Sequence, residues 1–411
     1  MESELKVITP QSTVQQSEPD DSPLLNQEPR TPEPQTQFMV SSQTIEEMEK
    51  KYAAYVRHDV YGTMGRGKLP WGEKFLLGLG LVFLLPIRVV GGMTILVIYY
   101  VICRVCTAFL APNREDEQED YAHMGGWRRA VIMQSGRYLS RVVLFVFGFY
   151  WIAETSRSNE VEGQLNNENA SRTDQTEELE RPGAIISNHV SYLDILYHMS
   201  TSFPSFVAKT GNPTNFVAFA SGSEFVKLVF GNIELVMYKN KCLGCVYVQR
   251  ELKSSDFKGV SGVVNDRIRE AHQNKFAPKM MLFPEGTTTN GDYLLPFKTG
   301  AFLAKAPVLP VILRYPYHRF SPAWDSISGA RHVILLLSQF VNYIEVTRLP
   351  VYHPSEQEKE DPKLYAENVR NLMAREGNLI LSDIGLAEKR VYHAALNGNI
   401  SMPTVLHQKD D

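Results

Sequence analysis

The chain has 411 residues, with 42 Lys and Arg against 46 Asp and Glu and a formal net charge of −4. This length allows one large domain or two ordinary ones. The balanced charge, without a dense basic block, argues against nucleic acid as a partner. Four cysteines in a chain of this length do not make a disulfide framework and fit a reducing compartment.

Residues 1–45 are rich in Gln, Ser, Pro and Glu, as in the stretches QSTVQQSEPDDSP and EPRTPEPQTQ. Such a composition buries too little apolar surface to offset the entropy that is lost on ordering. We therefore expect residues 1–45 to form a disordered cytosolic tail, with no signal peptide.

An apolar run of 29 residues, Phe75 to Cys103, contains a single charge, Arg88, and a single proline, Pro86. As one helix it would be roughly 43 Å long, against a hydrocarbon core of ~30 Å. Pro86, Arg88 and the Gly91-Gly92 pair favour two short halves that form a hairpin embedded from one side, with a tilted single span as the alternative. Six Lys and Arg residues occur on each flank, in residues 50–74 and 104–141, so the positive-inside rule gives no orientation.

A second apolar stretch, VVLFVFGFYWI, follows two arginines, and we interpret residues 137–152 as an interfacial helix with Tyr150 and Trp151 at headgroup level. The alternative is a core helix of the soluble domain. With this helix, residues 46–155 form a membrane-associated region. The polar, acidic residues 156–182 have no hydrophobic pattern and are interpreted as a linker.

From residue 183 onward, short β-rich runs alternate with helical patterns, which predicts an α/β domain with a mixed or largely parallel sheet flanked by helices. We assign residues 183–355 to this domain and residues 356–411 to a C-terminal helical region and tail. The helical stretch 256–272 places Phe257, Val260, Val264, Ile268 and Ala271 on one face. The strand candidates are 184–187, 205–208, 245–250, 279–283, 308–313 and 343–352.

The stretch NHVSYLDILYH places His189 just past the first strand, with Asp194 five positions on. An aspartate in the first helical turn can reach back to one ring nitrogen, which fixes the tautomer and leaves the other nitrogen as a base. The alternative is structural, because Ser191-x-x-Asp194 also fits a capping box. The chain has no Gly-x-Ser-x-Gly elbow, so the hydroxyl that is activated would belong to the substrate.

Three further segments carry polar groups or a proline at strand ends. CVYVQRE ends a strand with Arg250, a permanent cation suited to phosphate. A second segment contains Glu285-Gly286-Thr287, with Lys298 as a weaker phosphate candidate, and the strand VLPVIL contains Pro310. The pairs Cys103-x-x-Cys106 and Cys242-x-x-Cys245 have zinc-like spacing but lie in different contexts, and we expect no metal site.

Taken in order, these motifs resemble the glycerolipid acyltransferases, the family of lysophosphatidate and lysophospholipid acyltransferases. The family pattern is His-x4-Asp, an Arg-ended strand, Glu-Gly-Thr and a proline-bearing apolar strand. The resemblance implies that His189 deprotonates the glycerol hydroxyl of a lysophospholipid, which then attacks acyl-CoA. It further implies that Asp194 orients His189 and that the other motif residues hold the substrate, without a cofactor: Arg250, Glu285, Gly286, Thr287, Pro310 and Lys298.

Within this family, RPGAIISNHVSYLDILYHMS, KCLGCVYVQRE and LFPEGTTTNGDYL look like the plant lysophosphatidylethanolamine acyltransferases. That resemblance favours lysophosphatidylethanolamine as acceptor, with lysophosphatidate and lysophosphatidylcholine as alternatives, at the endoplasmic reticulum membrane with the catalytic domain facing the cytosol. Residues 210–240 depart from the relatives, as a lineage insertion or a misread exon boundary. Two alternative functions are a CoA-independent phospholipid transacylase and a catalytically silent membrane scaffold.

Overall fold

The computed structural model describes residues 42–110, 113–115, 118–120, 124–157, 181–209, 246–248 and 260–397. The described residues from 46 onward belong to one compact unit. Arg250 and the atypical segment 210–240 lie outside the described residues, as do both ends of the chain and most of the predicted linker.

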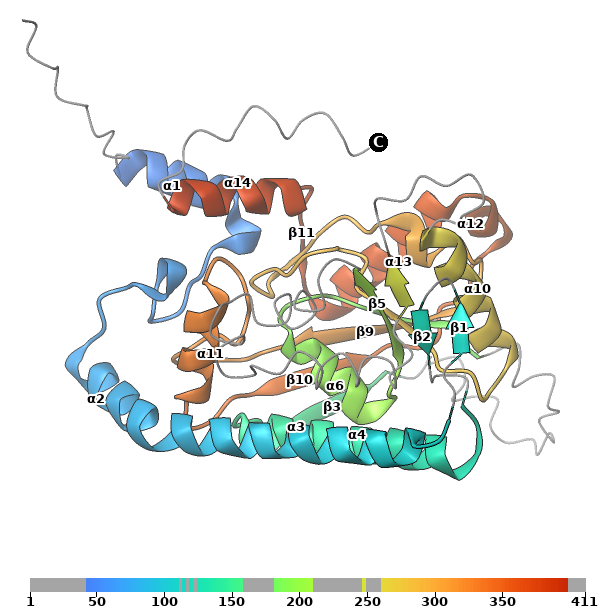
Figure 1. The fold of residues 1–411 in the computed structure, drawn as a ribbon. Coiled ribbons are helices and arrows are strands. Elements are labelled where there is room, and N and C mark those ends of the chain that lie inside the picture. The colour runs from blue at the N-terminus through green and yellow to red at the C-terminus, as the bar shows by residue number, and fades with distance from the viewer. Residues whose placement is uncertain are drawn as a thin grey trace, which may run out of the picture. The chain divides into compact units, whose positions relative to one another are not determined.

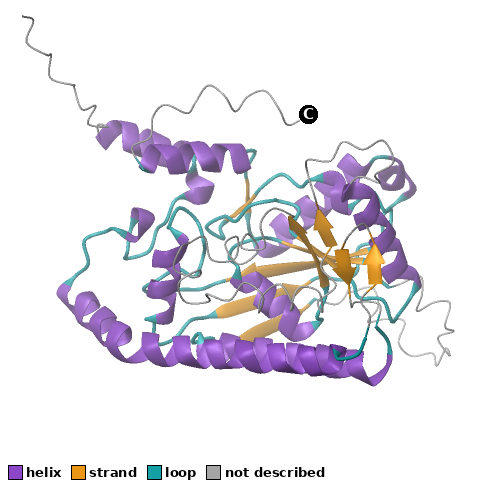
Figure 2. Cartoon of the chain, viewed as in Figure 1, coloured by secondary structure: helices purple, strands orange, loops and turns teal. Residues whose placement is uncertain are grey.

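A seven-stranded sheet forms the centre of the fold, in the order β3-β10-β9-β4-β7-β5-β6 (Figures 1 and 2). Neighbouring strands are parallel, with the exception of the antiparallel pair β9 and β10. The predicted α/β fold with a mixed, mostly parallel sheet is therefore confirmed. The strands are β3 (Ile152–Ser156), β4 (Ala184–Ser187), β5 (Ser205–Lys209), β6 (Val246–Val248), β7 (Met280–Leu282), β9 (Val308–Arg314) and β10 (Ile344–Arg348).

Helices cover both faces of this sheet (Figure 1). The described helices are α1 (Ser42–Lys51), α2 (Trp71–Leu79), α3 (Leu85–Thr107), α4 (Gly126–Val146), α6 (Leu193–Thr201), α10 (Val260–Gln273), α11 (Gly329–Leu337), α12 (Glu356–Glu360), α13 (Pro362–Gly377) and α14 (Leu386–Leu396). Two small strand pairs complete the described structure, β1 (Asn113–Glu115) with β2 (Gln118–Asp120) and β8 (Tyr293–Leu294) with β11 (Ile380–Leu381).

The period-2 alternation of the central strands divides the core into two layers. Ile185 and Leu313 point to the layer formed with α3, α4, α6 and α11, whereas Ile186 and Ile312 point to the layer formed with α10 and α13. Both faces are covered, which explains why β4 and β9 are almost continuously apolar. The predicted apolar face of α10 is confirmed by its buried members Val264, Ile268 and Ala271.

The apolar run forms one continuous helix of 37 residues, Trp71–Thr107, instead of the predicted hairpin. A π-helical turn at Gly80–Leu84 joins α2 to α3. Pro86, which has no N–H to donate, lies two residues past this π-helical turn inside the continuous helix. Within the described residues, this is the one helix long and apolar enough to cross a membrane.

One stripe of this helix packs along the sheet domain, and its other faces are apolar and exposed. Gly80 is buried, and from Arg88, the only charge of the run, the buried members recur every three or four residues: Arg88, Gly92, Ile95, Tyr99, Cys103 and Cys106. The exposed members include Val82, Phe83, Ile87, Val90, Val97, Val101 and Val105. The domain contact therefore extends along most of the helix.

Helix α4 is longer than the predicted interfacial helix at 137–152 and ends earlier, at Val146. Gly148 turns the chain at a φ of +93°, and the residues from Ile152 onward form the edge strand β3. The sheet thus begins before the predicted domain border at residue 183. Side chains on the inner face of α4, such as Ile132 and Leu144, are buried in the core, as the alternative interpretation expected. Its outer side carries the exposed aromatic rings of Trp127, Tyr138 and Phe145, with Trp151 beyond it.

Candidate active site

His189 lies in the short connection between β4 and α6, with its side chain 4% exposed. Its Nδ1 is 2.9 Å from Oδ2 of Asp194, which stands in the first turn of α6. An ionised carboxylate only accepts hydrogen bonds, so Nδ1 carries the proton and Nε2 keeps its lone pair. The predicted contact between these two side chains is therefore present.

The Asp194 carboxylate is buried and fully supplied with donors. Its Oδ2 also accepts the main-chain N–H groups of Val190 at 2.8 Å and Ser191 at 2.9 Å, while its Oδ1 accepts the Tyr315 hydroxyl at 2.6 Å. These main-chain bonds resemble one half of the alternative capping box, but no side chain caps the start of α6. Asp194 therefore closes the turn and orients His189 with the same oxygen.

Asn188 fixes the position of this turn against the sheet. Its side-chain amide donates to the carbonyl of Leu313 at 2.9 Å and accepts the Leu313 N–H at 2.8 Å. These two hydrogen bonds extend the parallel contact of β4 and β9 by one residue beyond Ser187, which lies opposite Val311. The backbone at His189 is thus held in register with β9.

One aromatic contact fixes the plane of the His189 ring, and a second supports it from behind through Phe283. Phe283 stacks on it with ring centroids 4.1 Å apart, and His198 meets the same phenyl ring edge-on at 6.2 Å. Burial lowers the pKa of His198 to about 3, so this second histidine is neutral at physiological pH. His198 is accordingly a packing residue here.

The Glu-Gly-Thr segment follows β7 and lies directly beside the histidine turn. Oε1 of Glu285 accepts the main-chain N–H of His189 at 2.7 Å, and Oε2 accepts that of Leu295 at 2.9 Å. Burial raises the pKa of Glu285 from 4.5 to about 8, against the opposing effect of these two N–H groups. Both carboxylate oxygens are thus engaged with the backbone.

Gly286 and Lys298 are close neighbours in this segment. Gly286 has a φ of +72°, and a Cβ built on it would lie 3.2 Å from the Lys298 amino nitrogen. The structure therefore brings Lys298 next to the Glu-Gly-Thr segment. Pro310 lies inside β9, opposite Ile186 of β4. Its carbonyl accepts the Leu349 N–H. Arg250 lies outside the described residues, so its relation to this group stays a prediction.

Comparison with known proteins identifies the family. An acyltransferase family model matches residues 164–314. Over 427 aligned positions the chain is 57% identical to the lysophospholipid acyltransferase LPEAT1 of Arabidopsis thaliana, with all of both chains covered. The chain belongs to the lysophospholipid acyltransferase family. A second Arabidopsis thaliana protein, LPEAT2, is 27% identical over 68% of this chain and 46% of its own length. Human lysophosphatidylcholine acyltransferase 1 is 40% identical over 38% of this chain and 29% of its own length.

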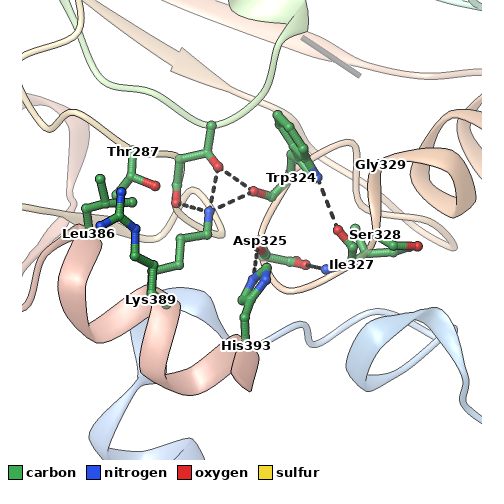
Figure 3. A pocket seen from close by; sticks show the side chains of 11 residues that line it. Thr287, Trp324, Asp325, Ile327, Ser328, Gly329, Leu386, Lys389 and His393 are labelled. Atoms are coloured by element: carbon green, nitrogen blue, oxygen red, sulfur yellow. Dashed lines mark hydrogen bonds between the residues drawn. The ribbon is translucent and has the colours of Figure 1, made fainter. Parts of the chain in front are cut away.

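In this acyltransferase a cavity of about 410 Å³ is lined by Thr287 and Thr288 and lies between α14 and the start of α11 (Figure 3). Lys389 of α14 extends along it, and its amino group donates to the carbonyl and hydroxyl oxygens of Thr288, both at 2.7 Å. It also donates to the Trp324 carbonyl at 3.2 Å (Figure 3). Burial lowers the pKa of Lys389 to about 7. No sequence pattern pointed to Lys389, because its partners are 65 to 101 residues away.

Proposed function

We propose that this enzyme transfers a fatty acyl group from acyl-CoA to the free glycerol hydroxyl of a lysophospholipid. Lysophosphatidylethanolamine is the favoured acceptor, on the resemblance to the plant enzymes, with lysophosphatidate and lysophosphatidylcholine as further acceptors. The single observation that carries the proposal is the buried contact of 2.9 Å between His189 Nδ1 and Asp194 Oδ2.

His189 acts as the general base in this mechanism. Its Nε2 removes the proton from the lysophospholipid hydroxyl while Asp194 stabilises the imidazolium that forms. The oxygen attacks the thioester carbonyl, a C–O bond forms and the C–S bond breaks. The CoA thiolate leaves and takes the proton from the imidazolium, which regenerates neutral His189 and gives phospholipid and free CoA.

The Glu-Gly-Thr segment supports this chemistry in two ways. Glu285 positions the His189 backbone, since its two carboxylate oxygens accept the N–H groups of residues 189 and 295. Lys298 supplies a cation beside Gly286 for the phosphate of the acceptor. We assign Thr287 and Arg250 to the same glycerophosphate, and Pro310 to the strand wall that holds the site.

The membrane is reached through the apolar helix Trp71–Thr107. Because its buried stripe packs on the domain along most of its length, a perpendicular span would draw the polar domain into the bilayer. We therefore place the helix in one leaflet of the endoplasmic reticulum membrane, with the domain in the cytosol. The exposed rings of Trp127, Tyr138 and Trp151 fit the headgroup level. A lysophospholipid then enters from the side and acyl-CoA from water.

The proposal is tested with microsomes from cells that express the full chain, supplied with labelled oleoyl-CoA and a panel of lysophospholipids. We expect label in the matching phospholipid, no transfer without acyl-CoA, and a loss of at least about 100-fold in His189→Ala. His272→Ala is the control, because His272 lies at the end of α10 and bonds the Arg181 carbonyl. Transfer without acyl-CoA would support the transacylase instead, and an active His189→Ala would exclude the base.

A further inference from the structure

Tyr315 is the long-range partner of the aspartate in the catalytic pair. It stands one residue past the end of β9, and its hydroxyl donates to Asp194 Oδ1 at 2.6 Å. The described partners of Oδ2 all come from residues 189–191, inside the turn itself. The phenol therefore ties the carboxylate to a different part of the sheet.

The surroundings of Tyr315 keep it as a hydrogen-bond donor. Its side chain is buried, and its ring packs edge-on against Phe149 with centroids 6.0 Å apart. Burial and the neighbouring Asp194 charge hold the pKa of this phenol well above its usual range. The phenol therefore keeps its proton at physiological pH and remains a donor.

The position of Tyr315 relative to Asp194 is fixed by the backbone. Asn188 makes two hydrogen bonds to Leu313. Asn188 lies one position before His189, and Leu313 lies two positions before Tyr315. Both ends of the chain His189–Asp194–Tyr315 thus start from a single fixed register between β4 and β9. Such preorganisation is what a group that orients a catalytic carboxylate requires.

We propose that Tyr315 is a positioning residue, whose phenol orients the Asp194 carboxylate toward His189 and shares its negative charge. The proposal rests on the proposed role of His189 as base. Two properties follow from the hydrogen bond. The carboxylate cannot turn away from Nδ1, which favours a high kcat, and its shared charge stabilises the imidazolium less strongly.

Removal of the Tyr315 hydroxyl should move the acid limb of the pH profile in one direction. In Tyr315→Phe, Oδ1 loses its donor, so the carboxylate charge is concentrated toward His189 and the imidazolium is favoured. The base is then neutral only at higher pH, and the acid limb of kcat/KM against pH moves upward by roughly half a unit to one unit. A free carboxylate also orients His189 less well, so kcat falls about ten-fold. Other described titratable groups near the pair or the phenol stay the same in both proteins: Glu285, His198, Tyr192 and Tyr197.

The experiment measures pH profiles of acyl transfer in microsomes that express the full chain, with the enzyme quantified in each preparation. Tyr365→Phe is the matched control, since Tyr365 is a buried phenol that donates to the Ala306 carbonyl in the other core layer. We expect its profile to coincide with that of the unmodified enzyme. A second probe, 3-fluorotyrosine at position 315, keeps the shape and donates more strongly, so its acid limb should move to lower pH.

Opposite shifts for Tyr315→Phe and the fluorinated residue support the proposal, and the fluorinated protein decides the matter if the phenylalanine variant fails to accumulate. An acid limb that stays in place in the folded variants overturns it, because a purely structural role lowers activity equally at every pH. His189→Ala is assayed in parallel. If His189→Ala is inactive and the pH profiles of the Tyr315 variants do not move, only the role of Tyr315 is rejected. If His189→Ala stays active, the roles of His189 as base and of Tyr315 as positioning residue are both rejected.

Discussion

The guanidinium of Arg88 donates to the main-chain carbonyl of Leu337 at 3.0 Å and so joins the apolar helix to the C-terminal end of α11. Further bonds reach the carbonyls of Gln339 and Phe340. These carbonyls lack partners within α11 and lie at the negative end of its dipole, so a buried cation is favoured there. The only charge of the apolar run thus docks the helix on the domain.

Arg88→Ala is expected to destabilise the folded enzyme by about 3 kcal/mol, because it leaves several buried carbonyls without donors. The measurement is thermal unfolding in detergent, alongside acyl transfer, which should fall with it. Membrane association should persist, since the exposed apolar faces are unchanged. Arg137→Ala, an exposed arginine of α4, should leave both readouts unaltered. Equal stability of the two variants would contradict the docking role of Arg88.

The placement of the helix in one leaflet predicts that both of its ends face the cytosol. Single cysteines in place of Lys68 and Ala130, which are exposed on either side of the helix, should both react with a membrane-impermeant maleimide in sealed microsomes. Protection of one position until detergent is added would show that the helix spans the bilayer. The unmodified chain, which contains four cysteines, of which Cys103 and Cys106 are buried, supplies the background.

The strands and the contact between His189 and Asp194 were predictable because each depends on local sequence. Continuous apolar runs predict buried strands, and the spacing of His189 and Asp194 lets an aspartate at a helix start reach back to the ring. The sequence alone could not replace the predicted hairpin by one continuous helix, because the partners of Arg88 lie about 250 residues further along the chain. The same holds for Tyr315, whose bond to Asp194 spans 121 residues.

Glu285 belongs to a motif that the sequence reveals, but its contacts could not be predicted from the sequence. The resemblance to the family assigns Glu285 to substrate binding, and that role stays a prediction. Its described partners are the main-chain N–H groups of His189 and Leu295, which no side-chain pattern encodes. Contacts from a side chain to a distant backbone leave no signature in residue types, so they emerge only from the fold.

Glu285 should make stability fall as pH rises. Its folded carboxyl keeps its proton up to a pKa of about 8, whereas an unfolded glutamate loses it near 4.5. Between these values the unfolded state binds fewer protons, so ionisation favours unfolding. In Glu285→Gln this dependence is absent, and its Tm relative to the unmodified enzyme should rise from about pH 5 to about pH 8.5. The exposed Glu356→Gln should show no such trend. A flat difference for Glu285→Gln would show that the carboxylate is ionised throughout.

Lys389 should have the opposite pH dependence. Its pKa is lowered to about 7 in the folded chain, whereas an unfolded lysine keeps its proton to about 10.5, so stability rises with pH above about 7. Lys389→Met should therefore lose Tm relative to the unmodified enzyme as pH increases toward about 9. Because Thr289 N–H bonds the His189 carbonyl at 3.0 Å, loosening Thr288 should also lower kcat several-fold. Arg390→Met, at the exposed neighbouring position, is the control. If the two variants show the same Tm trend and the same kcat, Lys389 does not act on the His189 turn through Thr288.

Gly286 should control the position of the Lys298 amino group. Its φ of +72° disfavours other residues, and a Cβ would come within 3.1 Å of Lys298 Cε. Gly286→Ala should therefore displace the amino group, at a strain of about 1 kcal/mol, and raise the apparent KM for lysophospholipid several-fold with that for acyl-CoA unchanged. Lys298→Met should reproduce this effect, whereas Gly300→Ala, which points into open space, should not. An unaltered KM in Lys298→Met would remove Lys298 from the phosphate site, and any defect in Gly286→Ala would then come from backbone strain alone.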